Sequence, residues 1–96
     1  MTITEVRMRR IDSTDRTKAV ASLTFDDSFV VHEVELVQRR DEIYVSMPSR
    51  RLPGGDYLDI AHPVNSRTRN YIKDEMLRVY EEALQEGRRQ YRAVSR

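Results

Sequence analysis

The sequence predicts an α+β domain in which a mostly antiparallel, meander-like sheet of four to five strands is followed by a C-terminal helix. Two observations support this class. Segments within residues 3–61 alternate apolar and polar residues, which is the period of half-buried strands. Residues 66–86 instead place apolar side chains at helical spacing. Because the expected strands precede the helix, we expect the helix to lie across one face of the sheet.

Four segments show the alternation that predicts the main strands. In the first, Val6 and Met8 alternate with Arg7 and Arg9, so the two pairs face opposite sides. The third holds six apolar residues in nine, which is typical of a central strand. Its alternation changes phase at His32-Glu33, as a β-bulge would cause. The four strands are expected at residues 3–11, 18–25, 29–37 and 42–47.

A loop and one short strand are expected between the fourth strand and the helix. Pro53-Gly54-Gly55 is a strong turn signal, so the segment 48–56 is predicted to be a loop. A short fifth strand is predicted at residues 57–61, ended by His62-Pro63.

The helix is expected to follow an N-cap at Asn65 or Ser66 and to end before Gly87, which suits the left-handed position after a helix. Leu77 and Leu84 make its apolar stripe wider than the roughly 100° needed to cover one sheet. Two explanations stay open: a second subunit packs on the helix, or the helix lies deep in its own core. The stripe itself consists of Ile72, Met76, Val79, Tyr80 and Ala83.

The chain is expected to form one domain over residues 1–86, followed by a mobile basic tail at 87–96 that has little to pack against. A chain of 96 residues has a thin core, which small domains often offset by oligomerising. Cysteine is absent, which excludes disulfides and thiolate zinc sites. Apolar runs are too short to span a membrane and the start lacks a signal-peptide core, so we expect a cytoplasmic protein with no membrane partner.

The residues that could support catalysis or bind metal are not arranged for either task. His32 and His62 lack the spacing of metal ligands. Asp59, His62 and Ser66 lie near one another in the sequence, but no nucleophile elbow accompanies them. Gly54-Gly55 alone does not make a phosphate-binding loop. We therefore expect a binding protein rather than an enzyme, with no catalytic residues, metal, cofactor or small-molecule substrate.

Basic residues gather in short clusters although the net charge is only +1. The planar guanidinium of arginine suits phosphate oxygens, so each cluster is a candidate for nucleic-acid binding. For an isolated Arg-Arg pair, solvated surface side chains are the more common explanation. The candidates are Arg50 and Arg51 in the loop, Arg67, Arg69 and Lys73 at the helix start, and Arg7 and Arg9, with Arg10 beside them, on the first strand.

The helix start and the tail each allow two interpretations. Arg67 and Arg69 oppose the helix dipole, at a cost of about 0.3–1 kcal/mol per position. They indicate either an anion bound near the helix N-terminus or local pairing with Asp59 or Asp74. In the tail, Tyr91 lies among arginines, as a side chain that stacks on an unpaired base often does. A solubilising end without a binding role is the alternative.

The run MPSRRLPGGDY at residues 47–57, followed by DIAHPVNS at 59–66, resembles the signature of the SpoVG (stage V sporulation protein G) family. The segments ITEVRMRR at 3–10 and FVVHE at 29–33 are similar to the opening and central strands of that family. The resemblance extends over roughly residues 1–84. It departs from the family pattern at Leu52, Gly54 and Leu58, where polar, acidic and basic residues are usual, and in the arginine-rich end after Gly87.

This resemblance implies a small dimeric α+β protein of the bacterial cytoplasm that binds DNA, RNA or both as a regulator. It links the chain to septation, cell division and sporulation. It also implies that the basic pair after Met-Pro-Ser, here Arg50 and Arg51, takes part in nucleic-acid binding. The alternative is a protein-interaction factor of the division septum that uses an exposed sheet edge or the wide helix stripe and has no direct nucleic-acid role.

Overall fold

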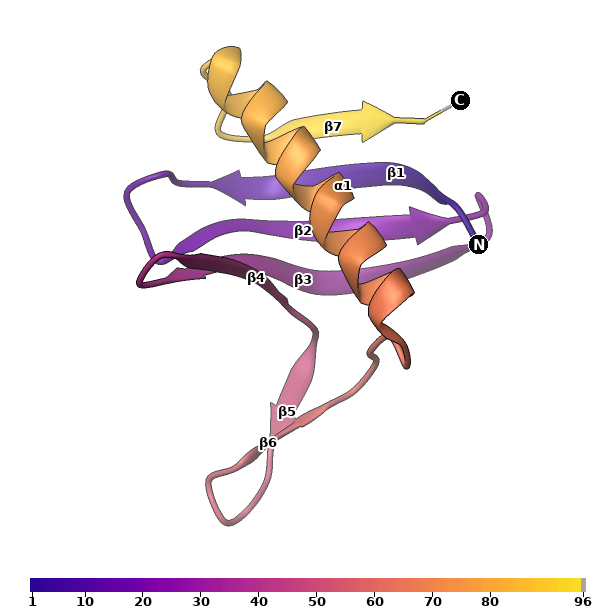
Figure 1. Cartoon of the computed structure of the whole chain (residues 1–96), viewed down its shortest axis with the longest axis vertical. Helices are drawn as coiled ribbons and strands as arrows, with labels where there is room; N and C mark the ends of the chain where they lie inside the picture. The colour runs from indigo at the N-terminus through magenta and orange to yellow at the C-terminus, as the bar shows by residue number, and fades with distance from the viewer. Residues whose placement is uncertain (96) are drawn as a thin grey trace.

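The computed structural model describes residues 1–95 and has two layers, a twisted sheet with one helix across it (Figure 1). The five strands of the sheet pair antiparallel in the order β4-β3-β2-β1-β7. The α+β class with an antiparallel sheet is confirmed. The elements are β1 (Ile3–Ile11), β2 (Thr17–Phe25), β3 (Phe29–Arg39), β4 (Glu42–Ser46), β5 (Ser49–Arg51), β6 (Tyr57–Asp59), α1 (Ser66–Gln85) and β7 (Tyr91–Val94).

The predicted bulge in the central strand is present. The register between β2 and β3 shifts between Ala21 and Leu23, and Glu33 has a left-handed φ of 59°. A bulge of this kind re-aims side chains on one strand. Here it leaves His32 and Glu33 on the surface, where His32 Nδ1 lies 2.7 Å from Ser22 Oγ and Glu33 pairs with Arg9.

The core lies between α1 and the sheet. Val6, Met8, Leu23, Leu36 and Met76 are all almost fully buried. Burying one such side chain contributes about 1.5–3 kcal/mol, so this layer dominates the stability of the fold. All five residues predicted for the helix stripe are buried: Ile72, Met76, Val79, Tyr80 and Ala83.

The two leucines that widen the stripe have different surroundings. Leu77 is partly buried and packs against the core, as expected if the helix lies deep in its own domain. Leu84 is 41% exposed near the end of α1. Packing within the domain therefore explains the apolar residue at position 77 but not the one at position 84.

Both ends of α1 are capped as the sequence indicates. Asn65 is the N-cap, and its side-chain oxygen accepts a hydrogen bond from the Thr68 N–H at 2.8 Å. At the other end Gly87 has a φ of 65° and donates to the Leu84 carbonyl, while the Arg88 N–H donates to Ala83. This pair of bonds is the Schellman motif, which reverses the direction of the chain after a helix.

The reversal places β7 beside β1, which corrects the prediction for the tail. Residues 87–96 were expected to have little to pack against, but Tyr91–Val94 pairs with β1 and extends the domain beyond residue 86. Tyr91 and Ala93 pack against the core, and their burial explains why the strand forms. Four residues are too few for a recognisable alternation. The predicted tail also includes Arg96, which lies outside the described residues.

The loop predicted at 48–56 and the fifth strand predicted at 57–61 need a second correction. Ser49–Arg51 is a strand, and it pairs with Tyr57–Asp59 in a separate two-stranded ribbon instead of joining the main sheet. Ser49–Arg51 is entirely polar, so no alternation predicted it.

Candidate nucleic-acid interface

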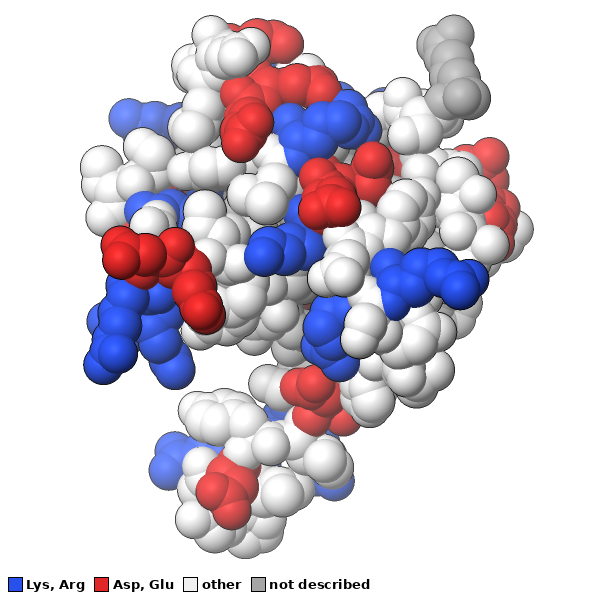
Figure 2. All heavy atoms as spheres, in the orientation of Figure 1, with Lys and Arg blue, Asp and Glu red and all other residues white. Residues whose placement is uncertain are grey.

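The β5–β6 ribbon projects from the body of the molecule, below β4 in the view of Figure 1. All six residues of its two strands are exposed. Figure 2 shows its basic side chains standing apart from the larger surface of the domain. Because its strand residues do not belong to the core, such a ribbon can enter a concave surface of a partner while the core stays intact.

A tight turn closes the ribbon. The Gly55 N–H donates to the Leu52 carbonyl at 2.9 Å, and the Leu52 N–H donates to the Asp56 carbonyl at 2.7 Å. Pro53 presets the second position of the turn, and Gly55 follows with a φ of 95°. A turn followed by a left-handed glycine is a common closure for antiparallel hairpins. The predicted turn signal is thus the tip of a hairpin.

Arg50 and Arg51 lie on this ribbon, but on opposite faces. Consecutive residues of a strand point to opposite sides. Arg50 pairs in register with Leu58, and Arg51 pairs with Tyr57. The ion pairs formed within residues 1–95 involve neither arginine. The two guanidinium groups are therefore available to phosphates on either side of the ribbon and do not converge on one anion.

The cluster at the helix start divides into different roles. Arg67 is exposed in the first turn of α1, and Lys73 is half-buried nearly two turns further on. Arg69 instead donates from Nη2 to the Pro63 carbonyl at 3.3 Å, which ties the loop before the helix to the helix itself. In the described part of the chain, neither Asp59 nor Asp74 forms an ion pair with this cluster.

The arginines of β1 lie on the side of the sheet away from the core. Arg7 and Arg9 are exposed, whereas Val6 and Met8 are buried, as the alternation predicts. Arg9 pairs with Glu33 on β3, and Arg10 pairs with Asp15 at 2.6 Å. These charge-assisted bonds raise the pKa of Arg10, chiefly through the Asp15 side chain, and lower that of Asp15.

The end of the chain brings two of the tail arginines to the edge of the sheet beside β1. Arg92 stands directly opposite Arg7 in the β1–β7 register, and Arg88 follows the Schellman glycine. Tyr91 faces the helix, with its hydroxyl 3.2 Å from Glu82 and 3.1 Å from Glu86. Burial first, and then these carboxylates, raise the pKa of Tyr91. The sequence showed these arginines gathered around Tyr91, but their pairing with β1 depends on distant residues and had no local signal.

The two histidines make separate local contacts. His32 bonds to Ser22 on the sheet, while His62 Nδ1 lies 3.0 Å from the Pro63 carbonyl in the loop before α1. Among residues 1–95, no group of three or more His, Cys, Asp or Glu side chains is placed to hold a metal ion. Residues 1–95 also contain no helix with the length and apolar character needed to cross a membrane.

Most of this chain is similar in sequence to known proteins. The family model described as SpoVG matches residues 1–82. Relatives of this chain include proteins that bear the name "Putative septation protein SpoVG". The one from Heliobacterium modesticaldum is 48% identical over 84 residues, covering 88% of this chain and 94% of the relative. The one from Caldanaerobacter subterraneus is 46% identical over 83 residues, with coverages of 86% and 91%. The one from Staphylococcus saprophyticus is 46% identical over 82 residues, with coverages of 85% and 81%. The chain belongs to the SpoVG family.

Proposed function

We propose that this chain binds nucleic acid through its β5–β6 ribbon, as a homodimer in the bacterial cytoplasm, and acts by binding rather than by catalysis. One observation carries the proposal: an exposed two-stranded ribbon presents Arg50 on one face and Arg51 on the other. Arginine is suited to phosphate oxygens because its planar group donates two parallel hydrogen bonds.

The dimensions of the ribbon support this partner. The major groove of B-form DNA admits a two-stranded β-ribbon. A ribbon that enters that groove by its tip would direct Arg50 toward one phosphate wall and Arg51 toward the other. Tyr57 is 70% exposed beside Arg51, and an exposed aromatic ring also offers a stacking surface for an unpaired base of RNA.

The remaining predicted residues fit this proposal to different degrees. Arg67 and Lys73 can contact phosphates that run past the ribbon toward the start of α1. Arg69 acts as a positioning residue, because its bond to Pro63 fixes the loop that joins the ribbon to the helix. The relatives are named as septation proteins, and we propose that regulation by nucleic-acid binding links this chain to septation and sporulation.

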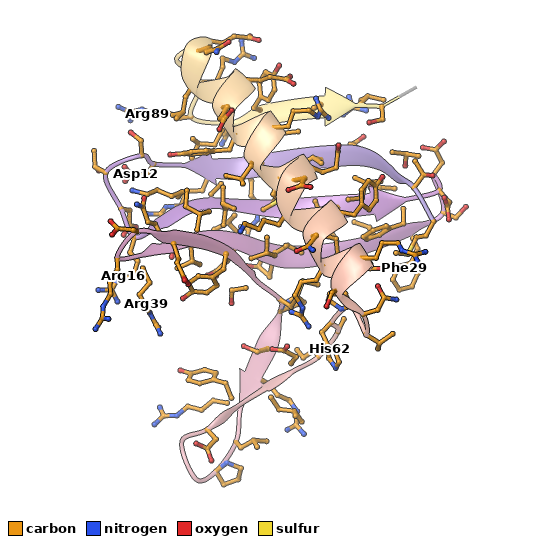
Figure 3. All side chains as sticks on the ribbon, in the orientation of Figure 1. Asp12, Arg16, Phe29, Arg39, His62 and Arg89 are labelled. Carbon is orange, nitrogen blue, oxygen red and sulfur yellow. The ribbon has the colours of Figure 1, made fainter. Side chains whose placement is uncertain are left out.

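The proposed homodimer has a candidate surface at the base of the ribbon. An apolar cavity of about 330 Å³ lies there between the β2–β3 turn and the start of α1. Figure 3 shows Phe29 and His62, which both line it, on the same side of the molecule. Two of the residues that line it, Met1 (72%) and Phe29 (67%), are exposed, and so are Ile60 (67%) and Val64 (87%), which flank its lining segment 61–63. A small domain gains stability by covering such a surface with a second copy.

The test measures binding of purified protein to fluorescein-labelled 20-mers, as duplex DNA and as single-stranded RNA, by anisotropy across a salt series. Arg50→Gln and Arg51→Gln are each expected to reduce the slope of log K against log salt by about 1, because each removes one phosphate contact. The control is the double variant Arg16→Gln/Arg39→Gln, which removes two exposed arginines, one in the β1–β2 turn and one at the end of β3 (Figure 3). Failure of the wild-type protein to bind either probe at low salt would reject the proposal.

The exposed apolar residues also favour a second candidate, a protein-interaction factor of the division septum. That function predicts a protein partner whose binding survives high salt and is lost on changing Phe29 or Val64. Nucleic-acid binding predicts the opposite, because phosphate contacts weaken steeply as salt rises.

A further inference from the structure

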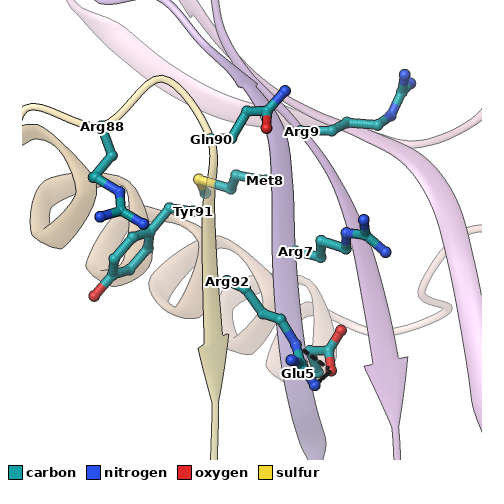
Figure 4. A pocket seen from close by; sticks show the side chains of 8 residues that line it. All are labelled: Glu5, Arg7, Met8, Arg9, Arg88, Gln90, Tyr91 and Arg92. Carbon is teal, nitrogen blue, oxygen red and sulfur yellow. Dashed lines mark hydrogen bonds and ion pairs between the residues drawn. The ribbon is translucent and has the colours of Figure 1, made fainter.

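A second basic surface lies at the opposite end of the molecule, where β7 meets β1. A groove of about 490 Å³ is lined there by Arg7, Arg9, Arg88 and Arg92 with Glu5 (Figure 4). A second hollow of about 710 Å³ continues from it, sharing Arg9, Arg88 and Gln90 and adding Arg10 and Arg89. Six arginines from the two ends of the chain thus line one continuous surface.

Carboxylates neutralise only half of these arginines. Within residues 1–95, Arg9 pairs with Glu33, Arg10 with Asp15 and Asp12, and Arg92 with Glu5 at 3.0 Å. Arg7, Arg88 and Arg89 take part in none of the ion pairs of the described chain, and all three are exposed. The groove therefore carries an excess positive charge that the protein itself does not balance.

The strand register makes this excess positive charge destabilising when no anion is bound. Arg7 and Arg92 stand directly opposite each other on β1 and β7. Like charges directly opposite on paired strands destabilise a sheet, whereas opposite charges stabilise it. Figure 4 shows Arg92 held toward Glu5 and Arg7 extending to the other side of β1. An anion bound at the groove would offset the charge of Arg7, which does not share the ion pair of Arg92 with Glu5.

The β7 half of this groove is also outside the family match. The SpoVG model ends at residue 82, before Arg88 and Arg92. What the family resemblance implies for Arg50 and Arg51 therefore says nothing of this end of the chain. The Schellman reversal at Gly87 and the pairing of Tyr91 and Ala93 with β1 create the groove.

We infer that the β1–β7 groove is a second nucleic-acid contact, which binds the sugar–phosphate backbone of the strand or duplex that the β5–β6 ribbon holds. This inference rests on the proposed function. The two surfaces lie at opposite ends of a molecule 42 Å long (Figure 1). At 3.4 Å per base pair, a duplex must be about 12 base pairs long to extend over that distance.

The test compares the wild type with Arg7→Gln/Arg88→Gln, which removes two exposed arginines that lack carboxylate partners. Anisotropy with the fluorescein-labelled 20-mers used for the ribbon is expected to show a loss of affinity on the order of tenfold at low salt. The slope of log K against log salt should fall by about 2. An 8-base-pair duplex, about 27 Å long, cannot reach both surfaces, and is expected to bind the two proteins alike.

Two controls distinguish a groove from general charge. Arg7→Lys/Arg88→Lys keeps both positive charges and is expected to preserve the salt slope. Arg16→Gln/Arg39→Gln removes the same net charge from the β1–β2 turn and the end of β3 and should leave 20-mer affinity close to that of the wild type. Circular dichroism checks that each variant is folded.

Three outcomes would overturn the inference. Binding by Arg7→Gln/Arg88→Gln equal to that of the wild type, while the Arg50 and Arg51 variants lose affinity, would reject the groove and leave the ribbon as the site. An equal loss in the Arg16/Arg39 control would reduce the effect to net charge. Self-association of the folded groove variant with unchanged 20-mer affinity would show that these arginines only protect the edge of the sheet. Absence of wild-type binding to either 20-mer would instead reject the proposed function itself.

Discussion

At the scale of single residues, Asp12 shows how a loop side chain couples this fold to pH. The Thr14 hydroxyl and backbone N–H donate to Asp12 Oδ1 at 2.6 and 3.0 Å. The hydroxyl bond first, and the backbone bond second, hold the pKa of Asp12 below its ordinary value. Because the folded pKa is the lower one, the stability that Asp12 contributes is present above the unfolded pKa and is lost as pH falls through the folded pKa.

Replacing Thr14 by valine is expected to raise the pKa of Asp12 toward its ordinary value, because the stronger of the two bonds is lost. Carboxyl carbon NMR shifts followed from pH 7 to pH 2 measure this directly. Ser13→Ala, next to it in the same turn, keeps both bonds and serves as the control. An Asp12 titration that is the same in the wild type and in Thr14→Val would contradict the assignment of the cause.

Asn65 is a second residue whose role is local and measurable. Its side chain caps α1 by accepting from the Thr68 N–H. Asn65→Ala is expected to lower the free energy of unfolding by about 1 kcal/mol, the usual cost of losing such a cap. Asn70→Ala, at an exposed position inside the same helix, should change stability in the opposite direction because alanine has the higher helix propensity. Urea unfolding followed by circular dichroism compares the two.

At the scale of elements, the β5–β6 ribbon depends on its turn rather than on the core. Gly55 has a φ of 95°, and a Cβ there would meet Arg51 Nη2 at an ordinary 3.8 Å. The cost of a side chain at this position therefore comes from the backbone. The six strand residues are exposed, so strain in the turn can loosen the ribbon without unfolding the domain.

Gly55→Ala is expected to destabilise the ribbon locally by about 1 kcal/mol, because alanine tolerates this φ poorly. Hydrogen exchange of the Leu52 amide, which donates to Asp56, should then become about fivefold faster. Gly54→Ala is the matched control, since nothing lies within 4 Å of its Cβ position. The thermal melting of the core should be the same in both variants. A lowered core melting temperature in Gly55→Ala alone would show that the ribbon is not independent.

At the scale of the whole molecule, the two kinds of surface are separated. Arginines line the β1–β7 end and the projecting ribbon, while the apolar cavity lined by the exposed residues Met1 and Phe29 lies at the base of the ribbon. Covering that apolar base with a second copy would hold two ribbons at a fixed separation. The proposed dimer would thereby determine the spacing of the phosphate contacts.

Phe29→Ser is expected to convert the dimer to a monomer, because it removes an aromatic side chain from the proposed interface. Phe29 is 67% exposed in one copy and is not a core residue, so the fold of that copy should be unaffected. Sedimentation velocity at micromolar concentration measures the change. Leu84→Ser, at an apolar residue that is 41% exposed at the other end of α1, should leave the dimer intact. A monomeric wild type at this concentration would contradict the proposed homodimer.

Much of this protein follows from its sequence alone. The strands β1 to β4, the capped helix and the bulge at Glu33 follow from periodicity and from residues with local preferences, such as Asn65 and Gly87. The basic residues Arg50 and Arg51 of the candidate site could also be identified from the sequence. These features are local, so a few neighbouring residues are enough to specify them.

Only the tertiary structure decided where those residues act. Strand pairing put Arg50 and Arg51 on opposite faces of a ribbon that the sequence left as a loop. The reversal at Gly87 brought Arg92 opposite Arg7, from 85 residues away, and made a strand of what the sequence left as a tail. The physical reason is that short strands are specified by the partners they bury and bond with. Those partners are distant in the chain, so no local pattern encodes them.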